Sequence, residues 1–175
     1  MAYLYHMVPR EMVGTILYPL NTLKYTHPDL FSEYAKKYSG REQVLERRIP
    51  TLDCLWNDVL HFTALHPKKV MEELVKLGCT PMHFECYQID SFQLDPANTT
   101  VFTYLRDVKG QVLIEDDFAP YDPSATDQWA YVPDATRTYF KESLEHGERP
   151  LMYHFVPHIL YKGNLDVSDA PVIKI

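Results

Sequence analysis

Side chains that can move a proton or hold a polar ligand lie close together in residues 56–69, WNDVLHFTALHPKK. This stretch contains Asn57, Asp58, His61 and His66. An imidazole titrates near neutral pH, so it can act as a general acid or base, and a nearby carboxylate can share that work. These residue types therefore indicate a catalytic or binding wall built on this stretch.

A strand over residues 57–65 would divide these side chains between two faces, because successive side chains of a strand alternate. One face carries both Asn57 and His61, which is unusually polar for a central strand. Two interpretations are open. In the first, Asn57 and Asp58 form the turn into the strand, and His61 is a hydrogen-bonded, half-buried histidine. Alternatively, Asn57, His61 and His66 line one cleft.

Two histidines elsewhere bear on the same question. His6 lies in an aromatic, β-prone segment, residues 2–8, and either packs in the core or faces the same cleft. His158 follows His154 by four positions, but Pro157 disfavours the helix on which that spacing would bind a metal. On a strand, the same spacing separates the two side chains by ~13 Å. No metal site is predicted, and His154 is expected in the core.

Other chemistry has weaker support. The chain contains neither a glycine-rich phosphate loop nor a G-x-S-x-G motif. Glu115, Asp116 and Asp117 could do acid–base work, but such a run is more typical of solvated charges. Arg48, like its neighbour Arg47, could hold a phosphate or could simply end a helix. Histidines within about 7 Å of one another would suit general acid–base hydrolysis of a phosphoester; the candidates are His6, His61, His66 and His158.

The strands and helices that must position these residues do not follow a repeating βαβ order along the chain, and this predicts an α+β fold. Strands are expected at residues 2–8, 57–65, 81–90 and within 151–167, with a hairpin of 99–108 and 111–118 around Lys109-Gly110. Helices are expected at 9–21 with a turn at Pro19, at 27–49 with a break near Gly40, at 66–78 and at 134–147. The acidic loop at 115–127 is either a lid or a plain surface insertion.

Within the second helix, the apolar and tyrosine positions share one face: Leu30, Phe31, Tyr34, Ala35 and Tyr38. Tyr18 and Asn21 either form a structured turn around Pro19 or face the cleft.

Composition bounds the class of protein. The chain has 175 residues and a formal net charge of -7, which predicts one domain, residues 1–175, and disfavours a broad nucleic-acid-binding face. Its three cysteines form no C-x-x-C pair, so reduced thiols in the cytoplasm are expected. No apolar run approaches the ~18 residues of a membrane span, and no membrane association is predicted.

Three separated segments resemble one family of enzymes. Residues 3–21, YLYHMVPREMVGTILYPLN, are similar to the first strand and helix of the ADP-ribosyltransferase fold. Residues 57–67, NDVLHFTALHP, resemble the second core strand of DarT-type nucleic-acid ADP-ribosyltransferases, and residues 156–169, VPHILYKGNLDVSD, resemble their late strand. The segment FECYQIDSFQLD, residues 84–95, would suit the middle of that fold.

The resemblance implies a split mixed or antiparallel sheet core with peripheral helices, NAD as the cofactor, and a nucleic-acid or protein acceptor. It implies that His6 reaches the NAD ribose and that Tyr18 stacks on the nicotinamide ring. The candidate cofactor-binding residues are His6, Tyr18, Asn21, Arg48 and Asn57, and the candidate catalytic residues are His61, His66, His158 and Asp58.

The sequence departs from the family at both catalytic positions. The family's arginine falls at or beside Leu65, with His66 next, and its glutamate falls near His158. An imidazole cannot replace a carboxylate that stabilises developing positive charge. Either Asp58 or Glu85 supplies the carboxylate, or the domain binds a nucleotide or a partner without transfer.

Overall fold

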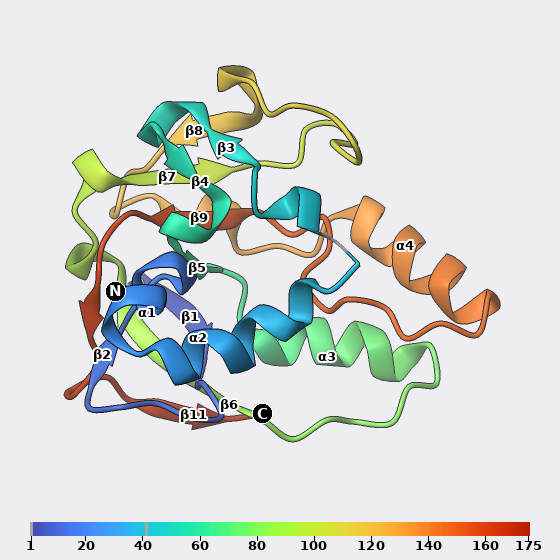
Figure 1. Cartoon of the computed structure of the whole chain (residues 1–175). Helices are drawn as coiled ribbons and strands as arrows, with labels where there is room; N and C mark the ends of the chain where they lie inside the picture. The colour runs from blue at the N-terminus through green and yellow to red at the C-terminus, as the bar shows by residue number, and fades with distance from the viewer. Residues whose placement is uncertain (1, 41) are drawn as a thin grey trace.

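Two antiparallel sheets form the centre of the fold (Figure 1). The computed structural model describes residues 2–40 and 42–175. The first sheet has the strand order β1-β6-β11, with β1 at Tyr3–Met7, β6 at Glu85–Asp90 and β11 at Val172–Lys174. The second has the order β5-β9-β7-β8, with β5 at Leu60–Phe62, β9 at His158–Tyr161, β7 at Thr99–Phe102 and β8 at Phe118–Pro120. This architecture is α+β, as predicted.

A single backbone bridge joins β1 of one sheet to the end of β5 in the other. The amide of Tyr5 donates to the carbonyl of Thr63 at 2.8 Å, and the amide of Thr63 donates back at 3.1 Å. Two short ribbons complete the strands: β2 at Ile16–Leu17 pairs with β10 at Leu165–Asp166, and β3 at Arg48–Ile49 pairs with β4 at Cys54–Leu55. The bridge therefore brings the β1 side chains beside those of β5.

Helices pack around these sheets. α1 (Leu20–Thr26) and α2 (Pro28–Ala35) lie over the junction of β1 and β5, while α3 (Pro67–Lys76) and α4 (Asp134–Glu145) pack against each other (Figure 1). The 3-10 turns are η1 (Lys36–Tyr38), η2 (Glu42–Val44), η3 (Pro50–Leu52), η4 (Trp56–Asp58), η5 (Ser91–Gln93), η6 (Pro96–Asn98), η7 (Glu115–Asp117) and η8 (Thr126–Trp129).

The alternation of side chains on β5 and β9 explains how one sheet serves two apolar clusters. Leu60, Phe62 and Ile159 enter the central cluster, which also holds Leu4 of β1 and Ile89 of β6. The opposite face carries His61 and His158, beside Leu160 and Phe102 of a second cluster built around Trp56. Both histidines therefore lie on the face that the central core does not occupy.

The strands predicted at 2–8 and 81–90 and the helices predicted at 66–78 and 134–147 are confirmed, each within a few residues. The strands expected within 151–167 are confirmed as β9 and β10. Helix α3 begins at Pro67 and is followed by Gly78 at a φ of 89°, so proline and glycine mark its two ends. The helix predicted at 27–49 is confirmed over α2 only, and α2 ends before Gly40, whose φ is 78°.

Two predictions are wrong, and a third is confirmed only in part. Residues 9–19 form no helix, and only Leu20 and Asn21 of the predicted range are helical, because Gly14 adopts a φ of 70° and Pro19 precedes α1 instead of ending a helix. The strand predicted at 57–65 shortens to β5, since Asn57 and Asp58 belong to η4. The tight hairpin is also wrong, because β7 ends at Phe102 and its partner β8 begins only at Phe118.

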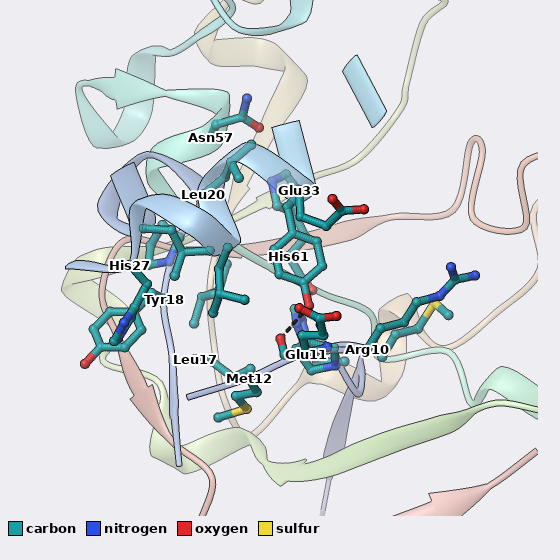
Figure 2. A pocket seen from close by; sticks show the side chains of 18 of the residues that line it. Arg10, Glu11, Met12, Leu17, Tyr18, Leu20, His27, Glu33, Asn57 and His61 are labelled. Atoms are coloured by element: carbon teal, nitrogen blue, oxygen red, sulfur yellow. Dashed lines mark hydrogen bonds between the residues drawn. The ribbon is translucent and has the colours of Figure 1, made fainter. Parts of the chain in front are cut away.

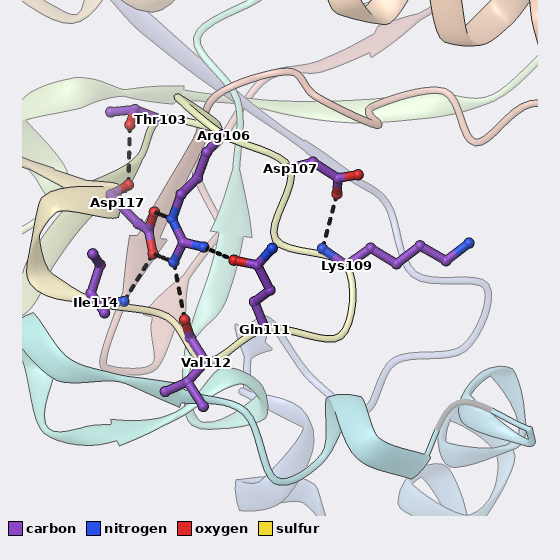
Figure 3. Close-up of polar contacts among 8 residues, drawn as sticks. All are labelled: Thr103, Arg106, Asp107, Lys109, Gln111, Val112, Ile114 and Asp117. Carbon is purple, nitrogen blue, oxygen red and sulfur yellow. Dashed lines mark hydrogen bonds and ion pairs between the residues drawn. The ribbon is translucent and has the colours of Figure 1, made fainter.

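The loop between β7 and β8 is held by a buried ion pair (Figure 3). Asp117 is 2% exposed and accepts from Arg106 Nε at 2.7 Å and Nη2 at 2.6 Å. Its carboxylate also accepts the amide of Ile114, and its carbonyl accepts the amide and hydroxyl of Thr103. Asp117 is thus a structural residue and not the solvated charge predicted, whereas Glu115 and Asp116 are exposed.

Candidate functional site

A cavity of about 660 Å³ lies where the two sheets meet, beneath α1 and α2 (Figure 2). Its wall is formed by the end of β1, residues 8–13, β2, both helices, η1, η4 and the start of β5. Small-molecule sites in proteins commonly measure roughly 300–1,000 Å³. The cavity is therefore large enough for a nucleotide.

Four of the nine predicted site residues line this cavity: His6, Tyr18, Asn57 and His61. They come from β1, the residues after β2, η4 and β5, which are far apart in the sequence. The other five lie outside the lining: Asn21, Arg48, Asp58, His66 and His158.

His6 is held in one tautomer. Its Nδ1 lies 2.8 Å from the carbonyl oxygen of His61. Because a carbonyl only accepts, Nδ1 carries the proton and Nε2 is left unprotonated. Burial lowers the pKa of His6; its bond to the His61 carbonyl opposes that shift, and the charge of Lys37 adds to it. The ring is therefore neutral at pH 7 and offers one lone pair.

His61 is held in the opposite tautomer. Its Nε2 lies 3.0 Å from the carbonyl oxygen of Trp56, so Nε2 carries the proton and Nδ1 is the acceptor. Burial, followed by the neighbouring His158, lowers the pKa of His61 to about 3. Its ring also packs 5.0 Å from the Trp56 ring, centroid to centroid. His61 is consequently a fixed, uncharged acceptor on the cavity wall.

His158 lies behind His61 and does not reach the cavity. The two ring centroids are 6.2 Å apart, within the separation proposed for acid–base hydrolysis. Nδ1 of His158 donates to the carbonyl of Val156 at 2.7 Å, and burial lowers its pKa to about 4. With these lowered pKa values neither ring is an imidazolium at pH 7, so the pair offers no strong general acid for such hydrolysis.

Asn57 is the most deeply buried polar residue of the cavity wall, with 1% of its surface exposed. Its Oδ1 accepts from the hydroxyl of Tyr38 at 2.9 Å. Its Nδ2 has no hydrogen-bond partner among the described residues. A buried donor without a partner is costly, so it requires an explanation.

Asp58 has a structural role. One carboxylate oxygen accepts the backbone amide of Leu55 at 2.7 Å, and the other accepts from Asn21 Nδ2 at 2.7 Å. These bonds fix η4 and tie it to α1, which agrees with the interpretation of Asn57 and Asp58 as a turn. They also account for Asn21, whose amide faces Asp58 and not the cavity.

The remaining predicted residues have local partners as well. His66 precedes α3 and accepts the amide of Lys68 at 3.1 Å, with its ring 4.9 Å from that of Tyr5. Arg48 pairs with Asp53 on the surface at 2.5 Å. Glu85, the alternative carboxylate, is exposed on β6 opposite Lys174.

Sequence reasoning missed the part of the wall that α2 and η1 supply. Glu33, Tyr34, Lys37 and Tyr38 line the cavity, together with Arg10 and Glu11 from the other side. The tyrosine spacing was visible as one face of the predicted helix, but the sequence did not indicate what that face contacts.

Residues 9–15, named here the strap, have no regular structure, and residues 9–13 among them line the cavity. The hydroxyl of Tyr34 donates to the carbonyl of Glu11 at 2.5 Å and accepts the amide of the same residue at 3.0 Å. Met12 contacts the hydroxyl of Tyr87 through its sulfur at 3.7 Å. The strap is therefore fastened to α2 by one side chain.

Comparisons of the chain with protein-family models, curated proteins and solved structures find no match. Among residues 2–40 and 42–175, no group of three or more His, Cys, Asp or Glu is placed to hold a metal ion. Over the same residues, no helix has the length and apolar character needed to cross a membrane.

Proposed function

We propose that this protein binds a nucleotide of the NAD or ADP-ribose type in the cavity. The observation that carries the proposal is His6, whose fixed tautomer leaves Nε2 as an acceptor on the wall of a cavity of suitable volume. Such an acceptor suits a ribose hydroxyl. Tyr18 offers an aromatic face, and Arg10 and Lys37 offer positive charge for phosphates.

The position of β1 supports an ADP-ribosyltransferase-like core within this α+β fold. The bridge to β5 brings His6 within hydrogen-bond distance of His61, so residues from the first and second resembling segments meet at one wall. His158, from the third resembling segment, lies next to His61, and the centroids of the two rings are 6.2 Å apart.

Binding is better supported than transfer. The expected catalytic carboxylate is replaced by the neutral His158, while Asp58 and Glu85 are engaged elsewhere. Among the acidic residues described, Glu11 and Glu33 line the cavity, and both are exposed. ADP-ribosyl transfer to a nucleic acid or a protein would require one of these two to reach the reacting ribose.

Titration calorimetry with NAD and with ADP-ribose tests the proposal. The wild-type protein should bind at least one of them, and His6→Ala should weaken binding about tenfold, the equivalent of one hydrogen bond in a buried site. His83→Ala is the matched control, because His83 is exposed and outside the cavity. If neither NAD nor ADP-ribose binds at concentrations up to about 1 mM, the proposal is refuted.

Incubation with NAD then separates binding from transfer. Binding without release of nicotinamide, with and without nucleic-acid or protein acceptors, supports a binding domain. Release that Glu11→Gln or Glu33→Gln abolishes would instead assign the missing carboxylate.

A further inference from the structure

We infer that the cavity binds an aliphatic chain against three leucines of its roof. These residues, named here the roof leucines, are Leu20 and Leu23 of α1 and Leu30 of α2, and all of them line the cavity. The inference goes beyond the proposed function, because neither NAD nor ADP-ribose contains a hydrocarbon chain.

The roof leucines do not take part in the apolar core. Helices α1 and α2 contain no buried residue, and the roof leucines themselves are half-buried. None of them belongs to, or packs against, any apolar cluster formed by the described residues. A surface helix ordinarily buries its apolar stripe against the core. The roof leucines line the cavity instead, so their apolar surface is open to a ligand.

Aliphatic side chains of other elements line the same cavity. Met12 of the strap and Ile16 of β2 are half-buried lining residues. Leu17 and Leu60 line the cavity from the central apolar cluster. A chain bound in the cavity would therefore contact aliphatic groups of the roof, the strap and the core. Each methylene that leaves water in this way strengthens binding by roughly fourfold.

Charged lining residues lie apart from the leucines. Arg10, Glu11 and Glu33 lie on the right of the close-up, whereas Leu17 and Leu20 lie to their left (Figure 2). A charged group beside the leucines would lose its hydration without gaining a partner. A concave site of about 660 Å³ has the size of a small-molecule site. The occupant of this part of the cavity is therefore the uncharged chain of a small molecule.

Ligand-detected NMR titration with 1-hexanol, 1-heptanol and 1-octanol tests the inference. The three alcohols share one small, uncharged head group, so the trend in their affinities reports the chain alone. Each should bind the wild-type protein at one saturable site. The dissociation constant should fall about fourfold with each added methylene.

Leu23→Asn and Leu30→Gln each replace a roof leucine with a polar side chain of comparable size. Each should weaken binding of 1-octanol about tenfold, because the chain then faces an amide group that it cannot pair. Each should also reduce the effect of an added methylene to less than about twofold. Leu105→Asn is the control, since Leu105 is 79% exposed and outside the cavity. Thermal unfolding identifies any variant that fails to fold.

Failure of 1-octanol to bind, equal affinity for the three alcohols, or an unchanged trend in the folded variants would overturn the inference. If NAD or ADP-ribose binds in that case, the proposed function survives without a site for a chain. If the alcohols bind as expected but neither nucleotide does, the chain site is supported and the nucleotide proposal fails.

Discussion

Three histidines near the cavity are each oriented by a backbone carbonyl and not by a carboxylate. His6 donates to residue 61, His61 to residue 56 and His158 to residue 156. A carboxylate partner would favour the charged imidazolium, whereas a carbonyl fixes the tautomer with much less effect on charge. Together with burial, this keeps His6 and His61 of the cavity wall, and His158 behind them, neutral.

The same burial should make the protein sensitive to acid. The pKa values of His61 and His158, about 3 and about 4, lie below the ordinary value of 6.5. Below pH 6.5 the unfolded chain binds protons at these positions that the folded protein does not, so stability is lost as the pH falls. Between pH 7 and pH 5, the free energy of unfolding should drop by about 2 kcal/mol for each histidine.

Urea unfolding at the two pH values measures this effect. His61→Gln and His158→Gln should each flatten the dependence on pH, even where they lower stability at pH 7. His83→Gln, at an exposed position, should leave it unchanged. Equal stability of the wild type at pH 7 and pH 5 would show that the rings are protonated in the folded state.

At the scale of elements, the strap depends on one hydroxyl. Tyr34→Phe removes both bonds to Glu11 and leaves the ring in place. The Glu11 amide should then exchange its proton about tenfold faster, and a ligand of the cavity should enter and leave faster. NMR-detected hydrogen exchange measures the first effect without any ligand.

Tyr25→Phe provides the comparison for this experiment, because Tyr25 is 81% exposed on α1. The same exchange rate at Glu11 in Tyr34→Phe and in the wild type would mean that the strap is held by other contacts.

The sequence predicted elements whose ends are locally encoded and missed those set by distant contacts. Pro67 and Gly78 delimit α3 whatever surrounds it. The β7–β8 loop, in contrast, depends on the pairing of Arg106 with Asp117, which no local pattern indicates. The strap likewise takes its path from Tyr34, more than twenty residues away.

The site was predicted in part for the same reason. His6, Asn57 and His61 were identified by residue type, and the alternation of a strand suggested a polar face. Asp58 was misassigned because its bonds to Leu55 and Asn21 depend on the three-dimensional turn. Lys37 and Tyr38 were missed because the position of η1 over the cavity follows from packing.

At the scale of the whole molecule, the two sheets share one apolar cluster. Leu4 of β1 is fully buried in it, between residues of both sheets. Leu4→Ala should therefore lower the free energy of unfolding by about 2–5 kcal/mol and preserve a single unfolding transition. Denaturation followed by circular dichroism and by hydrogen exchange measures both quantities.

Leu105→Ala should change stability by no more than about 0.5 kcal/mol, because Leu105 is 79% exposed. If Leu4→Ala instead separated the unfolding of the two sheets into distinct steps, the shared core would not be their main connection.

The position of Trp56 gives the protein an intrinsic optical reporter. The centroid of its indole ring lies 5.0 Å from that of the His61 ring on the cavity wall. The guanidinium of Arg47 lies 5.4 Å from the centroid of the same indole ring. The other tryptophan, Trp129, packs against the central cluster between the sheets. Indole fluorescence responds to charge and polarity around the ring, so a change in emission from Trp56 relative to Trp129 would register occupancy of the cavity without any attached dye.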